Sequence, residues 1–309
     1  MNKQPLLVCI VGPTAIGKTS LSIEIAKAFH TEIVSADSRQ FYKETTIGTA
    51  VPSKEELEAT QHHFIQNRSV FDDYSVGDFE KDAIDLLSSL FLKNNIIVLV
   101  GGSGLYVDAV VKGLDHFPSV PLEIREELNL EFTSKGIEAL QKELKKVDET
   151  YYEKVDIHNH HRIIRALEIF RATGLPYSSF LRSSDSQRSF NTLFIGLSAE
   201  RELIYKRINQ RVDIMISEGL VEEAKRLYPH KSLNALQTVG YRELFRHFEG
   251  EISLEKGIEE IKKNTRRFAK RQMTWNRRNE DIHWFPFDEN PSKIVEFIKE
   301  KTPNMGVSE

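Results

Sequence analysis

The stretch that decides the fold is LLVCIVGPTAIGKTSLSIEIAKAF, Leu6 to Phe29. An apolar run, Leu6–Val11, leads into Gly12–Thr19, which matches the pattern G-x-x-x-x-G-K-[ST], and a helix-like run follows to Phe29. Strand, glycine-containing loop and helix in this order form a phosphate-binding loop. The glycines let the backbone turn its N–H groups toward an anion, and the helix start adds partial positive charge. The motif therefore predicts a bound di- or triphosphate.

The residues of this loop have separate tasks. Lys18 would reach the phosphate oxygens, and the Thr19 hydroxyl can hold Mg²⁺. A chance match in a turn is the alternative, which the strand–loop–helix context disfavours. Most loops of this kind hold ATP or GTP, so nucleotide binding is also implied. The backbone that would surround the anion belongs to Gly12, Pro13, Thr14, Ala15, Ile16 and Gly17, followed by Lys18 and Thr19.

The first hundred residues alternate between strand-like and helix-like runs. Strands are expected at Glu32–Asp37 and Ile96–Val100, with a helix at Asp78–Leu92. Continuous apolar strands in such alternation are typical of a parallel sheet covered by helices on both faces. The sequence therefore predicts an α/β fold with a parallel sheet core like that of P-loop NTPases.

Residues 116–190 differ and predict a mostly helical insertion, which leaves residues 1–115 and 191–309 as the core. Helical patterns run over 122–134, 136–147 and 158–173, and no clear strand appears until Thr192–Leu197. Further helices are expected, in order, at Arg201–Ser217, Leu220–Leu227 and Leu254–Asn276.

The composition is that of an ordinary globular protein, 40% hydrophobic and 28% charged. The apolar runs are far shorter than the roughly 18 residues of a membrane span, so no membrane association is expected. Cys9 is the single cysteine and lies within an apolar strand, which indicates a small buried side chain in a reducing, cytoplasmic compartment.

One segment is strongly basic although the net charge of the chain is −4. Residues 262–278 hold eight basic side chains and no acidic one, which suggests a polyanionic partner. On a helix these cations would share one half of the surface, with Ile261, Phe268, Gln272 and Trp275 packing on the other. A merely solvated face is the alternative. The cations are Lys262, Lys263, Arg266, Arg267, Lys270, Arg271, Arg277 and Arg278.

The second carboxylate of an ordinary P-loop NTPase is missing from its usual place. It should follow a buried strand, but Ile96–Val100 ends in Gly101–Tyr106, sequence GGSGLY, without an acid. Asp37 instead follows the second strand and should lie beside the phosphate-binding loop. From spacing alone it could be a metal ligand, a general base or a helix cap.

Together these motifs resemble the tRNA dimethylallyltransferase family over about residues 5–285. The resemblance implies that the loop holds dimethylallyl diphosphate, and that the acceptor is N6 of the adenosine 3′ of the anticodon in tRNAs reading codons that start with U. The motifs, in order, are GPTAIGKT, SADSRQFY (35–42), GTAVP (48–52), HHF (62–64), YSVGDF (74–79), GGSGLY, NHHRIIRALEIF (159–170), QTVGYREL (237–244) and TRRFAKRQMTWNRR (265–278).

The resemblance also implies roles for single residues. Asp37 would take the proton from N6, and Ser103 would lie near the reacting adenosine. Loop amides, Lys18, Thr19 with Mg²⁺ as cofactor, and Arg211 would stabilise the charge on the departing diphosphate. Without the family, Arg211 would be taken for a solvated helix charge.

For tRNA the resemblance implies contacts from several segments of a monomeric enzyme, with the insertion helping to grip the anticodon arm. Two family positions differ, because Val51 replaces the usual Lys and His161 the usual Gln. The adjacent histidines of HHF and NHHR have no cysteine partners and do not predict zinc. The implied contacts are Asp37, Ser38, Arg39, Gln40, Ser103, Arg125, His161, Arg162, Ile163, Ile164, Arg165, Gln237, Thr238, Val239, Gly240, Tyr241, Arg242, Arg266, Lys270, Arg271 and Arg278.

Two other classes of protein remain as alternatives. A P-loop small-molecule kinase or NTPase explains Gly12–Thr19 but neither the basic segment nor the missing acid after Val100. A non-enzymatic RNA-binding protein explains the basic segment but gives the phosphate-binding loop and Asp37 no task.

Overall fold

The computed structural model describes residues 4–181 and 188–302. The chain divides into two compact units: Met1–Lys112 together with Arg188–Glu309, here called the core unit, and Gly113–Gln187, here called the helical unit. The insertion expected at 116–190 thus corresponds to residues 113–187, of which 182–187 lie outside the described residues.

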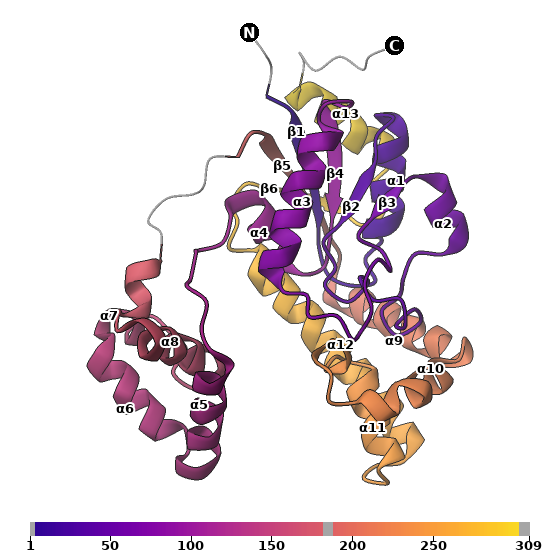
Figure 1. The fold of residues 1–309 in the computed structure, drawn as a ribbon. Helices are drawn as coiled ribbons and strands as arrows, with labels where there is room; N and C mark the ends of the chain where they lie inside the picture. Colours follow the sequence, from indigo (N-terminus) through magenta and orange to yellow (C-terminus); the bar gives the residue numbers. More distant parts are fainter. Residues whose placement is uncertain (1–3, 182–187, 303–309) are drawn as a thin grey trace. The chain divides into compact units, whose positions relative to one another are not determined.

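The core unit is built on a six-stranded parallel sheet (Figure 1). Across the sheet the strands lie in the order β3-β2-β4-β1-β5-β6, so β1 pairs with β4 on one side and β5 on the other. The C-terminal ends of β1, β2 and β4 therefore meet at one edge, where open parallel sheets bind their ligands. The strands are β1 (Leu6–Val11), β2 (Ile33–Ser35), β3 (His62–His63), β4 (Ile96–Val100), β5 (Asn191–Ser198) and β6 (Ile282–Pro286).

Side chains of β1 alternate between two hydrophobic clusters, one on each face of the sheet. Cys9 is fully buried in one of them, as predicted, and burial raises the pKa of its thiol. That cluster includes side chains of α3 (Val76–Leu90), α4 (Gly104–Lys112), α10 (Leu220–Leu227) and α11 (Tyr241–Phe248). The other cluster includes side chains of α1 (Lys18–Ala28), α9 (Arg201–Ser217) and α13 (Pro291–Lys301).

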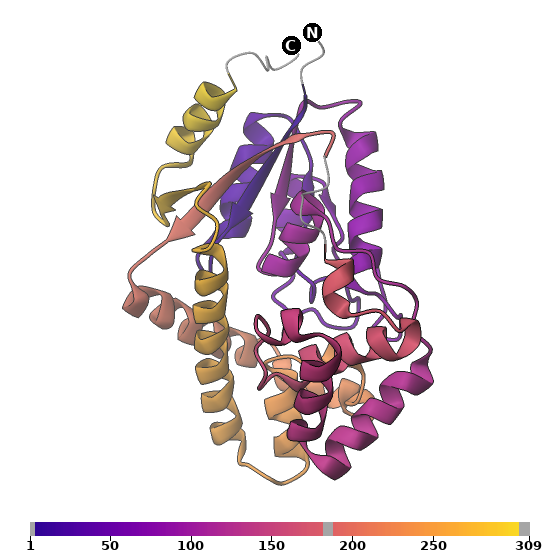
Figure 2. The same ribbon diagram turned by 90° about the vertical axis from the view of Figure 1, so that its left-hand side faces the viewer.

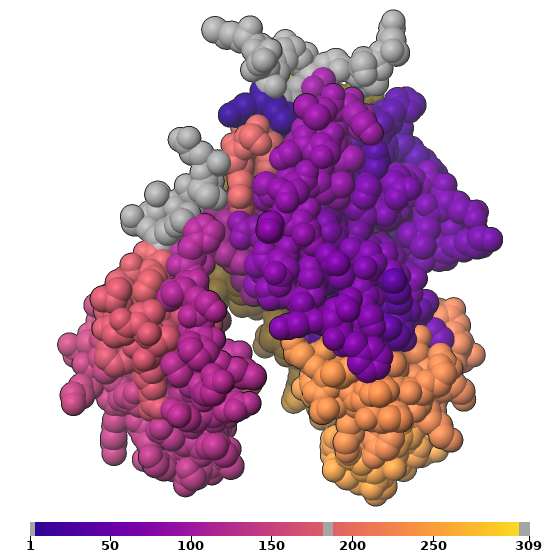
Figure 3. All heavy atoms as spheres, viewed as in Figure 1, coloured from indigo at the N-terminus to yellow at the C-terminus, as the bar shows by residue number. Residues whose placement is uncertain are grey.

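The long helix α12 (Leu254–Asn276) contributes to both clusters through Ile261 and Ala269. It runs unbroken along the core unit as the golden helix of Figure 2. Figure 3 shows that the orange region of α10 and α11 packs directly under the purple N-terminal half of the core unit. The remaining short elements of the core unit are α2 (Lys54–Ala59) and the 3₁₀ turns η2 (Tyr228–His230) and η3 (Asn234–Leu236).

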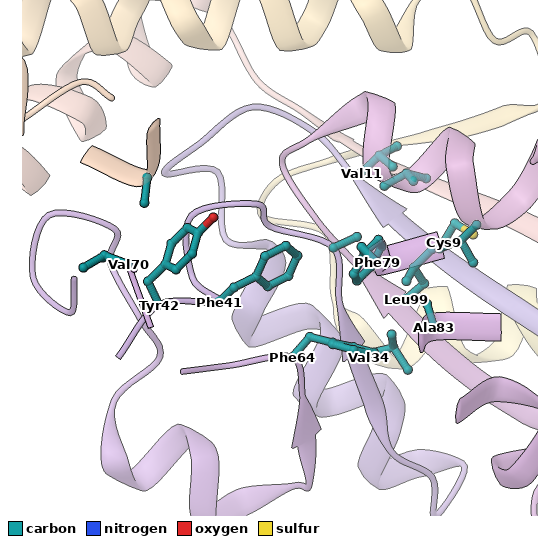
Figure 4. Packing of buried hydrophobic residues seen from close by; sticks show 14 of the residues in the cluster. Cys9, Val11, Val34, Phe41, Tyr42, Phe64, Val70, Phe79, Ala83 and Leu99 are labelled. Carbon is teal, nitrogen blue, oxygen red and sulfur yellow. The ribbon is translucent and has the colours of Figure 1, made fainter. Parts of the chain in front are cut away.

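Aromatic packing fixes the segment that follows Asp37 (Figure 4). Phe41 stacks on Phe79 of α3 with ring centroids 5.2 Å apart, and it meets Tyr74 edge-on at 5.5 Å and Tyr106 of α4 at 5.7 Å. Such pairs stabilise beyond the area they bury. The chain between β2 and α2 is therefore held against α3 and α4 from its first residues.

The helical unit has a hydrophobic core of its own. Leu128, Leu140, Leu144 and Leu167 are fully buried within it. Asp148 begins the shortest helix by accepting the Tyr151 N–H at 3.0 Å. The elements are α5 (Leu122–Lys135), α6 (Ile137–Val147), α7 (Glu149–Tyr152), α8 (His160–Thr173) and the 3₁₀ turn η1 (Tyr177–Phe180).

The helix limits expected for α9, α10 and α12 agree with the structure. Two other helices begin directly after a capping residue and not where they were expected to begin. α3 begins at Val76 because Ser75 and Asp78 form a capping box. α8 begins at His160 because the Asn159 side chain accepts the Arg162 N–H. β2 is shorter than its predicted span and ends at Ser35, two residues before Asp37.

Gly101 provides a test of the packing at the end of β4. A Cβ at this position would lie 2.5 Å from the Ala36 carbonyl oxygen, so the Gly101→Ala backbone must shift. We expect the free energy of unfolding to fall by about 1–3 kcal/mol, the usual range for overpacking.

Gly77→Ala in α3 is the matched control, because the nearest heavy atom to its Cβ would be at 3.6 Å. It should leave the stability unchanged or raise it by up to about 1 kcal/mol. Urea unfolding of both variants measures the difference, and equal effects would contradict the close approach.

Candidate active site

The phosphate-binding loop has the backbone conformation that its glycines allow. The φ angles of Gly12, Ala15 and Gly17 are 146°, 63° and 112°, all in a region that L side chains rarely adopt. A Cβ on Gly12 would also lie 2.8 Å from the Leu197 carbonyl oxygen of β5. α1 begins at Lys18, so the N–H groups of its first turn face the loop.

Side chains from two later helices hold this loop. The Gln272 Oε1 atom of α12 accepts the Thr14 N–H at 2.8 Å, and Arg207 of α9 donates its Nε–H to the Ala15 carbonyl at 2.7 Å. Lys18 donates to the carbonyls of Gly12 and Pro13 at 3.0 and 2.9 Å. Neither Gln272 nor Arg207 was predicted in this role, since both bond to backbone atoms distant in the chain.

A cleft of about 470 Å³ opens over the loop. Its floor is Thr14–Ser20, and Asp37 stands on the side where β2 ends. α9 contributes Arg207, Gln210 and Arg211, so the arginine expected from the resemblance does reach the loop. Apolar side chains line another part of the cleft: Val51, Pro52, Ile65 and Ile214.

The charges in the cleft influence one another. Burial lowers the pKa of Lys18 to about 8, while Asp37 acts in the opposite direction and Arg211 lowers the pKa further. Burial also lowers the pKa of Arg211, and Asp37 again opposes the shift. The cleft thus holds three cations, Lys18, Arg207 and Arg211, against two carboxylates, Asp37 and Glu56, and this excess of positive charge favours the arrival of an anion.

Asp37 does not cap an α-helix, which removes one of the three possibilities left open by the sequence. Its Oδ1 atom accepts the Arg39 N–H at 3.1 Å and so closes a turn. Ser103 lies nearby, where its Oγ accepts the Ser38 N–H at 3.2 Å and is 3.0 Å from the Ser38 Oγ. The predicted pair Asp37 and Ser103 is therefore brought together.

Each glycine of the Gly101–Gly104 turn makes room for a different neighbour. Gly101 approaches the Ala36 carbonyl, as described above. A Cβ on Gly102 would lie 2.6 Å from Gln272 Nε2. A Cβ on Gly104 would collide with the Trp275 ring. Trp275 further donates its Nε1–H to Asp108 of α4 at 3.0 Å. The turn is thus packed between β2 and α12, which the sequence pattern alone did not indicate.

A buried carboxylate fixes the loop that contains Val51. Glu223 of α10 accepts the N–H groups of Thr46, Ile47 and Gly48 at 2.9–3.0 Å and the Tyr241 hydroxyl at 2.7 Å. A Cβ on Gly48 would lie 2.6 Å from the Tyr241 ring. Neither Glu223 nor Tyr241 was among the predicted catalytic residues. The one signal for Glu223 is that an acidic residue occupies a position on the otherwise apolar buried face of α10.

The residues near Asp37 and in 237–242 that were expected to contact RNA differ in how exposed their side chains are. Arg39 donates to the carbonyls of Asn234 and Ala235, and Gln40 donates to those of Thr49 and Ala50. Gln237 and Arg242 are exposed, Gly240 is buried, Thr238 and Val239 are partly buried, and the Tyr241 side chain is fully buried. Tyr241 therefore supports the surface from inside the core.

The basic side of α12 is also divided. Lys262 pairs with Asp213, Lys263 pairs with Glu260, and Arg266 donates to Asn209 at 2.7 Å. The exposed cations are Arg267, Lys270, Arg271, Arg277 and Arg278. The expectation that Phe268 packs inside is wrong: it is 37% exposed, because the buried face of α12 is centred on Ala269, Gln272 and Asn276.

In the helical unit, one buried acid organises the expected arginines. Glu168 accepts from Arg125 at 2.7 Å and also pairs with Arg165, whose guanidinium lies 5.2 Å from the Phe117 ring centroid. His161 and Arg162 are exposed, while Ile163 and Ile164 are buried in the core of this unit. The two isoleucines therefore offer no side chain to an RNA.

Two general findings limit the chemistry. Within residues 4–181 and 188–302, no helix is both long and apolar enough to cross a membrane. The same residues contain no group of three His, Cys, Asp or Glu side chains placed to hold a metal ion.

Fold and cleft define a parallel α/β protein whose phosphate-binding loop is paired with a carboxylate from β2. The model of the IPP transferase family matches residues 40–279. A tRNA dimethylallyltransferase of Christiangramia forsetii is 59% identical over 96% of this chain and 98% of its own length. One of Flavobacterium psychrophilum is 56% identical over 96% and 98%.

Solved structures agree with these sequence matches. The full-length tRNA isopentenylpyrophosphate transferase of Bacillus halodurans has a TM-score of 0.73 and 36% identity, and the match covers 98% of both chains. A eukaryotic dimethylallyltransferase acting on tRNA shares the fold with a TM-score of 0.83 at 24% identity, over 99% of this chain and 81% of the other. The chain belongs to the IPP transferase family, whose close relatives here are tRNA dimethylallyltransferases.

The lowered pKa of Lys18 predicts a pH dependence of anion binding. Below about pH 8 the ammonium group is charged in the empty cleft, and above it the group is neutral. A bound polyanion favours the charged form, so the affinity for inorganic diphosphate should fall as pH rises above 8, with proton uptake on binding.

Titration calorimetry at pH 7, 8 and 9 in two buffers of different ionisation enthalpy measures both effects. Lys18→Arg is the control, since its charge persists and only the titration of diphosphate itself remains. Identical proton uptake by the two proteins would contradict the prediction.

Proposed function

We propose that this chain is a tRNA dimethylallyltransferase. It moves the dimethylallyl group from dimethylallyl diphosphate to N6 of the adenosine 3′ of the anticodon in tRNAs that read codons starting with U. One observation carries the proposal: a phosphate-binding loop and Asp37 share a cleft, whereas Gly101 follows β4 at the place where an NTPase has its acid. Membership of the IPP transferase family supports it independently.

The reaction needs a base for the acceptor. A bond forms between N6 and C1 of the dimethylallyl group, the C1–oxygen bond breaks, and its electron pair leaves with the diphosphate. N6 is a poor nucleophile because its lone pair is conjugated with the ring. Asp37 takes up the N6 proton, and the turn closed by the Arg39 N–H holds its carboxylate in place.

The leaving group needs positive charge. The loop amides, Lys18 and Arg211 meet the negative charge that grows on the bridging oxygen of the diphosphate. The Thr19 hydroxyl lies in the same cleft and would hold Mg²⁺, which prefers oxygen ligands shared with phosphates and water. Mg²⁺, when bound, would neutralise charge on the diphosphate.

The hydrocarbon part of the donor suits the apolar wall of Val51, Pro52, Ile65 and Ile214. These side chains line the same cleft as the loop that would hold the diphosphate. Val51 stands where the family usually has a lysine, so the wall is more apolar in this chain. Glu223 holds the backbone of residues 46–48, and this loop leads directly to Val51 and Pro52.

The RNA partner would be held by exposed cations on both units. In the core unit these are Arg242 and the exposed cations on and just after α12, and in the helical unit they are Arg125 and Arg162, with the partly buried Arg165 beside them. Phosphate contacts of this kind supply affinity, and an unpaired anticodon loop can present its adenine. We infer a monomeric enzyme that acts on tRNA in the cytoplasm.

The alternative of a small-molecule kinase or NTPase is not favoured. It leaves the exposed cations of α12 without a task, and the family relatives carry the names of tRNA-modifying transferases.

Asp37→Asn tests the base. The asparagine cannot take up the N6 proton, so the single-turnover transfer rate should fall by about 10²–10⁴-fold while binding of diphosphate and tRNA persists. The assay uses Mg²⁺, labelled dimethylallyl diphosphate and unmodified tRNA, with nucleoside analysis to locate the label. Asp73→Asn, an exposed carboxylate, is the matched control. A normal rate for Asp37→Asn would remove it from the reaction, and no transfer by the wild type would refute the proposed function.

Neutralising Lys270, Arg271 and Arg278 together tests the RNA surface. Each lost phosphate contact should reduce the log–log salt dependence of tRNA affinity by about one unit. Lys81, Lys93 and Lys299, which are also exposed, serve as the control triple. Measuring tRNA affinity from low to moderate salt distinguishes the two, and an equal slope for both triples would mean that α12 does not face the RNA.

A further inference from the structure

Gln272 is a buried residue in the last turns of α12, and both the oxygen and the nitrogen of its side-chain amide form hydrogen bonds. Its Oε1 atom accepts the Thr14 N–H at 2.8 Å, and its Nε2 atom donates to the Gly102 carbonyl at 2.8 Å. The side chain is only 7% exposed. One side chain therefore links the phosphate-binding loop to the turn after β4.

The two linked segments carry opposite parts of the proposed reaction. Thr14 belongs to the loop that would hold the diphosphate of the donor. Gly102 precedes Ser103 and lies beside Asp37: a Cβ built on it would be 2.6 Å from Gln272 Nε2 and 3.5 Å from Asp37 Oδ2. The amide thus stands between the donor side and the acceptor side of the cleft.

Only an amide fits this place. The Thr14 N–H needs an acceptor and the Gly102 carbonyl needs a donor, and the nearly buried Gln272 side chain supplies both at the wall of the cleft. A hydrocarbon side chain of equal length would satisfy neither group. An ionised carboxylate would satisfy the first alone and would also face the negative charge of Asp37.

We propose that Gln272 is a positioning residue for prenyl transfer, which fixes the distance between the phosphate-binding loop and the Asp37–Ser103 side without touching either substrate. The inference rests on the proposed function. Transfer requires N6, C1 and the leaving oxygen in line, and a displacement of about 1 Å can lower a rate about 100-fold. Losing the link should therefore slow transfer far more than it weakens binding of either ligand.

Gln272→Met removes both hydrogen bonds and keeps the length of the side chain. Its single-turnover rate at saturating tRNA and dimethylallyl diphosphate should fall by about 10–100-fold, with Kd values for inorganic diphosphate and tRNA within about threefold of wild type. Gln141→Met is the matched control, because Gln141 also donates to a backbone carbonyl at 2.8 Å, that of Ile157 in the helical unit. This control should keep its rate.

Gln272→Glu separates positioning from a loss of folding. A protonated carboxyl can accept from Thr14 and donate to Gly102, whereas an ionised one can only accept. The ratio of its rate to that of the wild type should therefore rise as pH is lowered from 8 to 5.5, because the ratio cancels pH effects that both proteins share. Thermal unfolding of each variant is followed in parallel.

The outcomes are distinct. A slow Gln272→Met with normal ligand affinities, together with the rising ratio of Gln272→Glu, supports the proposal. A normal rate for Gln272→Met overturns the proposal. So does a loss of rate that is fully explained by a lower diphosphate affinity or a lower melting temperature. In either case, transfer by the wild type still upholds the proposed function. An absence of transfer by the wild type overturns both.

Discussion

The close approach of two elements to the turn Gly101–Gly104 determines how the segment with Asp37 and the helix α12 lie against the end of β4. Ala36 of the segment after β2 touches the turn on one side, and Gln272 and Trp275 of α12 touch it on the other. A Cβ on Gly101 would collide with the Ala36 backbone, so backbone packing sets the spacing there, whereas Cβ atoms on Gly102 and Gly104 would meet the side chains of Gln272 and Trp275, which set the approach of α12. Rigid placement of this kind suits a reaction in which three atoms must be aligned, since alignment supplies much of the rate.

Under the proposed function, an architecture typical of nucleotide binding serves a different chemistry. Backbone amides and Lys18 line the loop between β1 and α1, and such groups would bind a diphosphate without distinguishing a nucleotide from a prenyl donor. The decisive change is the place of the carboxylate, which follows β2 instead of β4. Under the proposed function Asp37 would then face an incoming adenine, and Val51 lines the same cleft.

Much of this site follows from local sequence patterns, and the rest depends on distant partners. Lys18 and Asp37 could be placed in one cleft because each follows a parallel strand, and such strands end at the same edge of a sheet. Arg211 needed the family resemblance, since its position on a charged helix carries no signal of its own. Gln272 and Glu223 could not be predicted, because their partners Thr14 and Thr46 lie 258 and 177 residues away in the chain. The predicted starts of α3 and α8 differ from the observed ones because a capping side chain decides where the first turn begins, and hydrophobic periodicity does not reveal that residue.

Arg188 marks the point where the chain returns to the core unit, and it is tied there by Glu80 at 2.6 Å and by the Ala109 carbonyl at 2.7 Å. The chain leaves after α4 and re-enters at β5, so the departure and the return both adjoin α4. Because each unit also has its own hydrophobic core, the helical unit is an exchangeable module. Evolution could lengthen, shorten or replace it to suit different RNAs while the sheet and its chemistry stay intact.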